Sequence, residues 1–249
     1  MPETAPNTLL VTGGSSGIGA ACARLAAEQG RDVILTYHSS QKAAEAVAAD
    51  IRAMGRKAQA LQCDVADPAS IAALFAQIDP ATPIDLVNNA GIVAPAASIA
   101  DLDADRVTRI FATNAIGTIL VAKHAVAHIR AAPAPGHIVN ISSVAARLGS
   151  PDLYLDYAAS KGAIDTFTRG LAEELAPEGI RVNAIRPGLI LTDIHAKGGE
   201  PGRAERLAQT SVPMKRPGTA LEVAETVLFL LSDAASYVTG AILDVSGGR

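Results

Sequence analysis

Tyr157 and Lys161 are the two side chains of this sequence whose types and spacing most directly suggest chemistry. On a helix, residues four positions apart lie on one face, about one turn from each other. A free tyrosine has a pKa of about 10 and exchanges protons poorly at neutral pH. A lysine charge about 4 Å away, at an effective dielectric constant of about 20, supplies the roughly 4 kcal/mol that would bring this pKa near 7. The pair therefore predicts a proton donor and acceptor, although the same spacing also occurs on solvated helix faces.

The elements that must position this pair are predicted by an alternation of short β-rich apolar runs and longer alanine-rich stretches. We expect strands at 8–12, 32–36, 58–63, 84–87, 137–141, 180–185 and 241–245. We expect helices at 17–29, 41–54, 68–78, 105–130, 155–176 and 221–231, the third of them capped by Asp67. This alternation is typical of βαβ units on a parallel sheet covered by helices on both faces.

A glycine-rich turn follows the first expected strand and opens the first expected helix. Its glycines are Gly13, Gly14, Gly17 and Gly19. Such a turn lets the backbone approach a pyrophosphate, and the helix start offers free N–H groups with the positive end of the helix dipole. The context of strand, turn and helix favours a dinucleotide site over a plain glycine turn.

The spacing Gly13-x-x-x-Gly17-x-Gly19 after Thr12 matches every fixed position of the pattern T-G-x-x-x-G-x-G. Four further motifs follow in order along the chain. They are the N-N-A-G of 88–91, the set Asn114, Ser143, Tyr157 and Lys161, the Pro187-Gly188 that precedes Thr192, and the stretches 237–240 and 244–248. With these motifs the whole chain resembles the classical short-chain dehydrogenase/reductase family.

The resemblance implies a single Rossmann-like domain over residues 1–249, a three-layer α/β/α sandwich with a seven-stranded parallel sheet. The densest glycine and proline region, 196–203, interrupts the regular pattern late in the chain. It is either a plain surface loop or part of a mobile lid, which we expect at about 190–212.

The resemblance also implies the roles of four catalytic residues. Tyr157 would give a proton to the substrate oxygen or take one from it, and Lys161 would lower its pKa and bond the nicotinamide ribose. Ser143 would hold the substrate oxygen. Asn114 would interrupt its helix and hold a water in a proton relay through Lys161. Together they imply an oxidoreductase that interconverts a carbonyl and a secondary alcohol by hydride transfer with NAD(P)(H).

By the same resemblance, a larger set of residues would bind the cofactor. They are Gly13, Ser15, Ser16, Gly17, Ile18, Gly19, His38, Ser39, Asp64, Val65, Asn89, Ala90, Gly91, Tyr157, Lys161, Pro187, Gly188, Ile190 and Thr192. On the residues alone, Asn88 and Asn89 are also ordinary turn formers, and Asp64 an ordinary acid at a helix entry. No metal is expected, since none of the five histidines falls in a metal-ligand spacing.

Two candidates compete with the chosen catalytic residues. Tyr154 lies three residues before Tyr157, but its i+4 position is alanine, so we expect it to be a pocket or helix-start aromatic. Ser142 precedes Ser143, and the family pattern uses the second serine. Ser143 and Tyr157 are fourteen positions apart, one more than is commonest in the family. We therefore expect an inserted residue within 148–156, near the substrate mouth.

The choice between NADP(H) and NAD(H) depends on the end of the second expected strand. NAD recognition usually places an acid there to bind the ribose 2′-hydroxyl. Residues 36–39 read Thr-Tyr-His-Ser, with His38 where many NADP-preferring members carry arginine. Ser39 would bond the phosphate. Ser16 argues the other way, because an arginine or lysine often stands there in NADP enzymes. We favour NADP(H) and leave NAD(H) open.

The overall pattern looks like the branch that contains 3-oxoacyl-carrier-protein reductases and glucose-type sugar dehydrogenases, and the sequence does not decide between them. Arg147, Arg203 and Arg206 are either solvated or attractive to an acyl carrier. The resemblance further implies a homotetramer. A catalytically silent NAD(P)-binding regulatory protein on the same scaffold is the alternative, although all four catalytic positions are retained.

The composition limits other functions. The chain has 249 residues, 49% of them apolar, and a formal net charge of −4 without a basic stripe, so a nucleic acid partner is not expected. Cys22 and Cys63 predict no disulfide framework and are expected to be small core residues in a reducing cytoplasm. The polar start is no signal peptide, and the absence of eighteen consecutive apolar residues predicts no membrane span.

Overall fold

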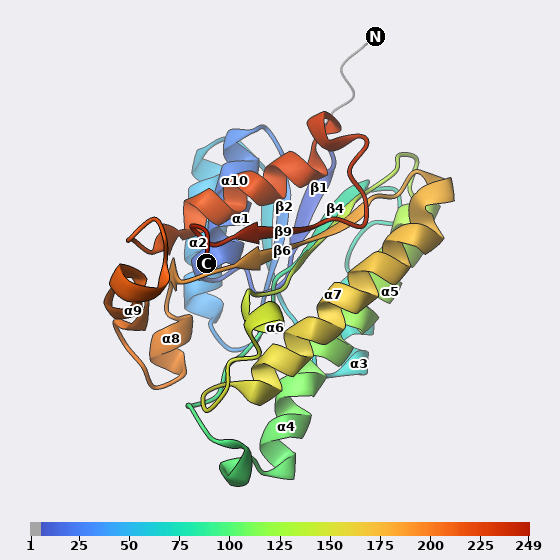
Figure 1. Ribbon diagram of the computed structural model, residues 1–249. Coiled ribbons are helices and arrows are strands. Elements are labelled where there is room, and N and C mark those ends of the chain that lie inside the picture. The colour runs from blue at the N-terminus through green and yellow to red at the C-terminus, as the bar shows by residue number, and fades with distance from the viewer. Residues whose placement is uncertain (1–5) are drawn as a thin grey trace.

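A parallel sheet of seven strands runs through the centre of the molecule, in the order β3-β2-β1-β4-β5-β6-β9. The computed structural model describes residues 6–249, apart from the side chains of His195 and Lys197. In sheet order the strands are β3 (Ala58–Gln62), β2 (Val33–Tyr37), β1 (Thr8–Val11), β4 (Ile84–Asn88), β5 (Ile138–Ile141), β6 (Val182–Pro187) and β9 (Ile242–Val245). Figure 1 shows helices on both sides of this sheet. The predicted three-layer, Rossmann-like architecture with seven parallel strands is confirmed.

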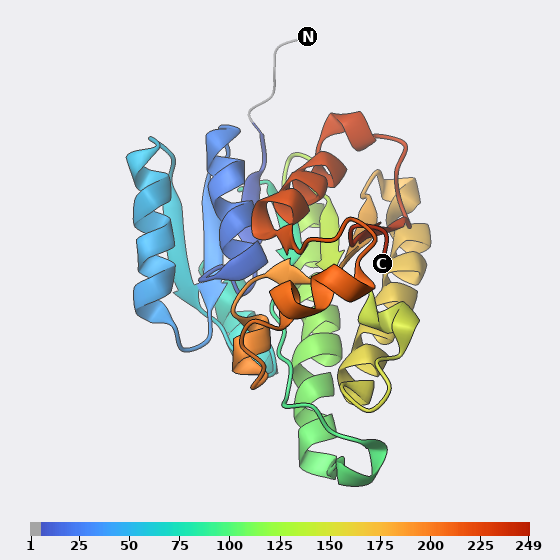
Figure 2. The same cartoon turned by 60° about the vertical axis from the view of Figure 1, so that its left-hand side comes forward.

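Two groups of helices cover the two faces of the sheet (Figures 1 and 2). One face carries α1 (Gly17–Glu28), α2 (Gln41–Ala53) and α10 (Ala220–Leu231). The other carries α3 (Pro68–Phe75), α5 (Thr118–Ala131) and α7 (Leu155–Leu175). Asp67 caps α3 as expected, accepting from the N–H groups of Ala69 and Ser70. The expected helix over 68–78 is three residues too long, because α3 ends at Phe75.

The expected helix over 105–130 is three consecutive pieces. α4 (Ala104–Phe111) begins after the N-cap Asp103, a π-helix spans Ala112–Gly117, and α5 continues to Ala131. Taken together, Ala104–Ala131 is long and apolar enough to cross a membrane by length and composition alone. Half of its most apolar window is buried inside the protein, and Val121, Ala125 and Ile129 pack into the core beside the sheet. The apolar character of Ala104–Ala131 is thus explained by its position in the core of the α/β fold.

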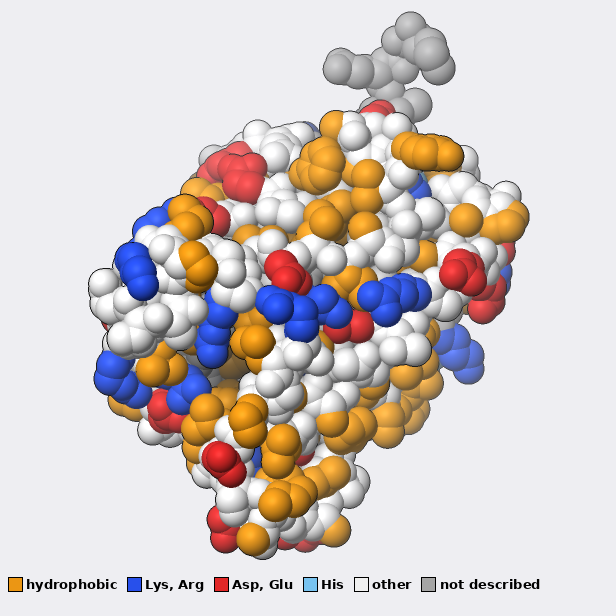
Figure 3. Space-filling model, viewed as in Figure 1, with side chains coloured by type: hydrophobic (Ala, Val, Ile, Leu, Met, Phe, Trp, Pro, Cys, Tyr) orange, Lys and Arg blue, Asp and Glu red, His pale blue; other side chains and the backbone are white. Residues whose placement is uncertain are grey.

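A separate group of short elements follows β6. It comprises β7 (Ile190–Leu191), α8 (Ile194–Lys197), α9 (Arg203–Ser211) and β8 (Gly218–Thr219), with β7 and β8 paired in parallel. A further short helix, α6 (Ala145–Leu148), follows β5. None of these five elements was expected from the sequence. Figure 3 shows a hollow between α8 and α6, with lysine and arginine side chains gathered around it.

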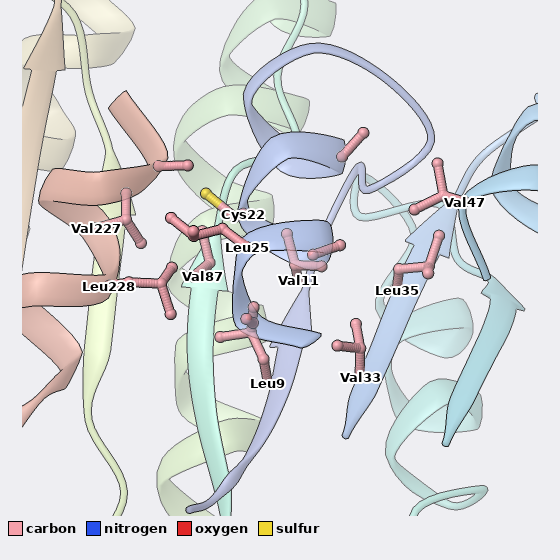
Figure 4. Packing of buried hydrophobic residues seen from close by; sticks show 14 of the residues in the cluster. Leu9, Val11, Cys22, Leu25, Val33, Leu35, Val47, Val87, Val227 and Leu228 are labelled. Atoms are coloured by element: carbon pink, nitrogen blue, oxygen red, sulfur yellow. The ribbon is translucent and has the colours of Figure 1, made fainter. Parts of the chain in front are cut away.

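Alternating residues of the strands enter two separate hydrophobic clusters. Leu9 and Val11 of β1 face α1, whereas Leu10 packs on the opposite face. Figure 4 shows Cys22 and Leu25 of α1 close to Leu9 and Val11. Both faces of β1 are thus buried, as expected for a central parallel strand. Both cysteines are buried and unpaired, and burial raises the pKa of the Cys22 thiol to about 12.

Candidate active site

Thr12 connects the turn after β1 to the end of β4 by hydrogen bonds. The Oγ1 atom of Thr12 accepts hydrogen bonds from the N–H groups of Asn89 and Ala90, both at 3.0 Å. In return, Nδ2 of Asn89 donates to the carbonyl oxygens of Thr12 at 2.8 Å and Gly13 at 3.1 Å. Thr12 is fully buried. The motifs of 12–19 and 88–91, far apart in the sequence, therefore form one hydrogen-bonded unit.

Three glycines make this unit a shallow cradle at the start of α1. Gly13 and Gly17 have φ angles of +65° and +56°, which L side chains rarely adopt. A Cβ atom on Gly19 would lie 2.5 Å from both Asn89 Nδ2 and the Gly13 oxygen, and one on Gly17 would lie 3.3 Å from Thr192 Cγ2. The first N–H groups of α1 have no partner within the helix. A backbone cradle and a helix start suit a pyrophosphate, so the residues fit a dinucleotide.

Other predicted cofactor residues surround this cradle. Ser15, Ser16 and Gly17 line a surface hollow of about 420 Å³ with the outer side of α1 and the start of α10. Gly91 lies close to Lys161, because a Cβ atom on Gly91 would be 3.5 Å from Lys161 Nζ. Ile18 packs against the core cluster beneath α1. The cradle therefore extends from the start of α1 to the neighbourhood of Lys161.

His38 and Asp64 lie together at the ends of β2 and β3. Their side chains approach to 3.6 Å between Nε2 and Oδ2, and both are well exposed. Asp64 Oδ1 also accepts from the Ala66 N–H at 2.9 Å, and the neighbouring Val65 is buried. Ser39 is exposed beside His38. The carboxylate thus stands next to the residue expected to face a 2′-phosphate, a proximity that the sequence did not reveal.

The side chains of Ser143 and Tyr157 meet beyond the end of β5. Ser143 lies close enough to Tyr157 to lower the pKa of its phenol, and the Ser143 Oγ accepts from the Ala145 N–H at 3.1 Å, at the start of α6. Tyr157 stands in the first turn of α7. Burial raises the pKa of the Tyr157 phenol, and Ser143 acts in the opposite direction. The serine is therefore the polar partner that the phenol has in this structure.

Lys161 lies one turn after Tyr157 on the same helix. Its Nζ is 5.8 Å from the Tyr157 ring centroid and donates to the Ile141 carbonyl at 2.7 Å. Burial lowers the pKa of Lys161 to about 8, while the charge of Asp165 acts to raise it. Burial acts against the expected lowering of the Tyr157 pKa, and the ammonium of Lys161 bonds the main chain, so the expectation that Lys161 brings the phenol near neutrality stays a prediction.

Asn114 occupies the π-helix between α4 and α5 and is fully buried. Its side chain pairs with the main chain of Ile92: Oδ1 accepts from the N–H at 2.8 Å and Nδ2 donates to the carbonyl at 2.9 Å. Nδ2 also donates to Ser160 Oγ at 3.2 Å, and the Asn114 carbonyl accepts from Thr118 Oγ1 at 2.8 Å. The asparagine thus interrupts its helix, as expected, and joins it to the loop after β4 and to α7.

The predicted residues after β6 lie beside the end of the chain. The Pro187 carbonyl accepts from the Val144 N–H at 3.1 Å, next to Ser143. A Cβ atom on Gly188 would lie 2.8 Å from Ser246 Cα, and Ile190 belongs to β7. Thr192 touches the cradle at Gly17. The structure therefore brings the cradle, the segment 187–192 and the four predicted catalytic residues to one edge of the sheet. These four are Asn114, Ser143, Tyr157 and Lys161.

Comparison with known proteins identifies the family. The family model described as enoyl-(acyl carrier protein) reductase matches residues 13–249. The crystal structure of a short-chain dehydrogenase from Burkholderia cenocepacia J2315, in complex with NADP, is 37% identical, with a TM-score of 0.87 and 97% of each chain covered. This chain belongs to the short-chain dehydrogenase/reductase family. It is an oxidoreductase of that family and works with NAD(P).

Two curated members of the short-chain dehydrogenase/reductase family are similar to this chain over nearly its whole length. An uncharacterised oxidoreductase, YgfF, from Escherichia coli (strain K12) is 49% identical over 244 residues, covering 96% of this chain and 98% of that protein. The cis-4-hydroxycyclohexanecarboxylate dehydrogenase of Sinomonas cyclohexanicum is 39% identical over 251 residues, covering 98% and 96%. Both alignments extend over essentially the entire chain.

Tyr154 of this short-chain dehydrogenase has a partner that sequence reasoning missed. Its hydroxyl donates to Glu200 Oε1 at 2.8 Å. Arg203 NH1 donates to both oxygens of Glu200 at 2.7 Å, and its guanidinium lies 5.1 Å from the Tyr154 ring centroid. Burial raises the pKa of Tyr154 to about 12. Tyr154, Glu200 and Arg203, named here the latch, join the segment before Tyr157 to the start of α9.

Arg106 and Asp156 form a second connection that sequence reasoning missed. Arg106 Nε donates to Asp156 Oδ2 at 2.7 Å, and NH1 donates to the Pro95 carbonyl at 2.7 Å. Burial acts to raise the pKa of Asp156, but the bonds from Arg106 and from the Tyr157 N–H outweigh it, so this pKa falls below its usual value. The only indication in the sequence was that an acid, Asp156, directly precedes Tyr157. The pair holds α4 and the loop after β4 against the start of α7.

Proposed function

We propose that this protein interconverts a ketone and a secondary alcohol, with Tyr157 as the proton donor and NADP(H) as the preferred cofactor. The observation that carries the proposal is the position of Tyr157 close to Ser143, with Lys161 Nζ 5.8 Å from its ring centroid, at the edge of the sheet that also holds the glycine cradle. A phenol and a hydroxyl close together can both bond a substrate oxygen, whose charge changes during the reaction.

The proposed roles follow from these positions. The cofactor supplies a hydride to carbon or removes one from it. Ser143 holds the substrate oxygen, and Tyr157 gives it a proton during reduction or takes one during oxidation. Lys161 bonds the nicotinamide ribose and returns protons to Tyr157, with Asn114 holding a relay water. The remaining predicted cofactor residues line the route from His38 past the cradle to Thr192.

The preference for NADP(H) rests on His38 and Ser39 at the end of β2, where no acid belongs to the strand itself. Asp64 lies 3.6 Å from His38 and opposes this preference in part, because its charge repels a phosphate. We therefore expect a modest preference, with kcat/KM for NADPH above that for NADH. A higher value with NADH would contradict it.

The proposal also covers the domain, the lid, the cellular location and the assembly of the protein. The chain acts as a single domain over 1–249 in which residues 190–212 form the substrate lid, and the latch is the contact by which the lid closes. The two buried, unpaired cysteines support a cytoplasmic location. Four copies would assemble through the outer faces of α4, α5 and α7, where Ile116 and Ile119 are exposed.

The test is a panel of carbonyl compounds run with NADPH and with NADH, and of alcohols run in the oxidative direction. The panel includes cyclic ketones, diketones, aldoses, acetoacetyl thioesters and a 2-enoyl thioester, so that sugar dehydrogenase and 3-oxoacyl reductase activities are separated. Reduction of at least one ketone with NADPH is expected. Binding of NADPH without turnover of any member would instead favour the catalytically silent alternative.

A further inference from the structure

Both main-chain polar groups of Tyr157 are bound by neighbouring side chains. Its N–H donates to Asp156 Oδ1 at 2.9 Å, and its carbonyl oxygen accepts from Ser160 Oγ at 2.7 Å. The first N–H groups of a helix have no partner within it, and the regular bonds of α7 begin with the Ala158 N–H, which donates to the Tyr154 carbonyl. The main-chain position of Tyr157 therefore depends on the side chains of Asp156 and Ser160.

Each of these two side chains leads to the helix that carries Asn114. Asp156 is buried and paired with Arg106 of α4, whose Nε donates to Oδ2 at 2.7 Å and whose NH2 donates to Oδ1 at 3.3 Å. Ser160 Oγ accepts from Asn114 Nδ2 at 3.2 Å, in the π-helix that continues α4. Figure 1 shows α4 beside the start of α7, against which it packs. Tyr157 is thus held between two connections to the same neighbouring helix.

Arg106 is itself held from several sides. Its N–H donates to Oδ1 of Asp103, the N-cap of α4, at 2.7 Å, and its NH1 donates to the Pro95 carbonyl at 2.7 Å. The loop that contains Pro95 also joins the segment before Tyr157, because the Ala97 N–H donates to the Leu153 carbonyl at 2.9 Å. Each nitrogen atom of the guanidinium is bonded, so Arg106 is a rigid link between α4, the loop after β4 and the start of α7.

We infer that Arg106, acting through Asp156, is a positioning residue for proton transfer by Tyr157. The inference rests on the proposed function, in which the Tyr157 hydroxyl meets the substrate oxygen beside Ser143. Proton transfer needs a hydrogen bond of about 2.6–3.2 Å, and a misplacement of about 1 Å can slow a reaction by about 100-fold. Arg106 acts on the main chain of Tyr157 and not on the substrate or the cofactor.

The test separates positioning from stability. Arg106→Met should destabilise the fold and lower kcat, whereas the double variant Arg106→Met/Asp156→Asn removes the unpaired charge and should regain stability without regaining kcat. For a ketone that the wild type reduces, we expect kcat of the double variant to stay about tenfold or more below the wild-type value. The Kd for NADPH should change by less than about threefold, because Thr12 and Asn89 hold the cradle together. Arg106→Lys keeps the charge but not the planar set of donors, and should have an intermediate kcat.

Arg31→Met is the matched control. Arg31 forms another buried ion pair, with Asp85 near the start of β4, whereas the site lies beyond the opposite ends of the strands. Its loss should also destabilise the protein, while kcat, measured well below the unfolding midpoint, stays within about twofold of the wild type. A double variant that regains kcat together with stability would overturn the inference and leave the proposed function standing. So would an Arg31→Met variant that loses as much kcat as Arg106→Met.

A second measurement needs no turnover. Hydrogen–deuterium exchange of the amides of 155–158 should be several-fold faster in the double variant than in the wild type, because the first turn of α7 loses its connection to α4. The same amides should exchange at the wild-type rate in Arg31→Met. If no ketone is reduced, the proposed function fails, and this exchange alone decides whether Arg106 positions Tyr157. Equal rates in the double variant and the wild type would show that it does not.

Discussion

The hydroxyl of Tyr154 donates a hydrogen bond to Glu200 Oε1 at 2.8 Å, and this single bond joins the residues before Tyr157 to the start of α9. Both Tyr154 and Arg203, the other member of the latch, are buried. Since the pKa of Tyr154 is about 12, the hydroxyl keeps its proton over the whole range in which such an enzyme is assayed. Deprotonation of Tyr154 therefore does not break this bond near neutral pH, and we propose that the bond holds the segment 190–212 in place.

Tyr154→Phe should loosen the lid while leaving the fold intact. Losing one hydrogen bond lowers the free energy of unfolding by only about 1 kcal/mol. We expect protease cleavage within 196–203 to become several-fold faster, and KM for the carbonyl substrate to rise. Limited proteolysis followed by mass spectrometry checks the first point. Tyr237→Phe, at a fully exposed tyrosine, is the control. Equal cleavage rates in both variants would show that the latch does not hold the lid.

Lys161→Met should reveal how much the burial of the Lys161 ammonium lowers the stability of the fold. The pKa of Lys161 is about 8 in the folded chain and 10.5 in the unfolded reference, a difference of about 3 kcal/mol. The unfolded chain therefore binds more protons between these values, so the lysine's cost is fully present below pH 8 and disappears as the pH rises to 10.5.

Relative to the wild type, Lys161→Met should accordingly be most stable near neutral pH and lose this advantage in alkali. Urea unfolding of both proteins at about pH 7 and pH 10 measures the difference. Lys123→Met, at an exposed lysine of α5, should show no such dependence. A difference between Lys161→Met and the wild type that stays constant with pH would mean that the lysine is not desolvated in the fold.

Arg106→Met should destabilise the protein strongly because it leaves Asp156 buried without its cation. Removing one partner of a buried ion pair costs about 3–5 kcal/mol. The double variant Arg106→Met/Asp156→Asn should regain much of this loss, and Arg130→Met, which breaks the exposed pair with Glu178, should change the unfolding midpoint little. Chemical denaturation of the four proteins is the measurement. A double variant no more stable than Arg106→Met would argue against the unpaired charge as the cause.

The sign of the pH dependence follows from the pKa of Asp156, which lies below its usual value in the folded chain. The pair with Arg106 then contributes stability above the unfolded pKa of 3.8, and this contribution is lost as the pH falls through the lower folded pKa. Arg106→Met should therefore differ from the wild type less in acid than at neutral pH.

Gly19→Ala should damage the cradle, because its Cβ atom would lie 2.5 Å from Asn89 Nδ2 and from the Gly13 oxygen. We expect weaker NADPH binding, by about tenfold or more, together with lower stability. Gly170→Ala is the matched control: it lies within α7 with nothing within 4 Å of the added atom, and should be neutral or stabilising by up to about 1 kcal/mol. Titration of NADPH fluorescence compares the two. Unchanged binding in Gly19→Ala would contradict the assignment of the cradle.

The sheet and its helices were predictable because their signals are local. Residues 8–12 alternate between two buried faces, and the glycines of 13–19 predict a tight turn before a helix. Asp67 followed by Pro68 predicts the start of α3. Such patterns depend only on residues close together in the sequence, so they can be recognised without knowing the tertiary contacts.

The parts that could not be predicted depend on partners far away in the chain. The π-helix around Asn114 is held by the main chain of Ile92, and the latch connects Tyr154 to Glu200 across 46 positions. The region 196–203 was expected to be a surface loop or part of a lid, and residues 198–202 do form turns, but the short helices α8 and α9 on either side of them were not expected. The burial of Tyr157, which acts to raise its pKa, could not be predicted either, since the spacing shows the nearby lysine but not the burial.

The central claim, that Tyr157 exchanges the proton with the substrate oxygen, is tested most directly by kcat of Tyr157→Phe with a ketone that the wild type reduces. Loss of the hydroxyl should lower kcat by about 100-fold to 10,000-fold while the Kd for NADPH stays within about twofold. Tyr237→Phe, the exposed control, should keep both values. A Tyr157→Phe variant that binds NADPH and turns over near the wild-type rate would contradict the account.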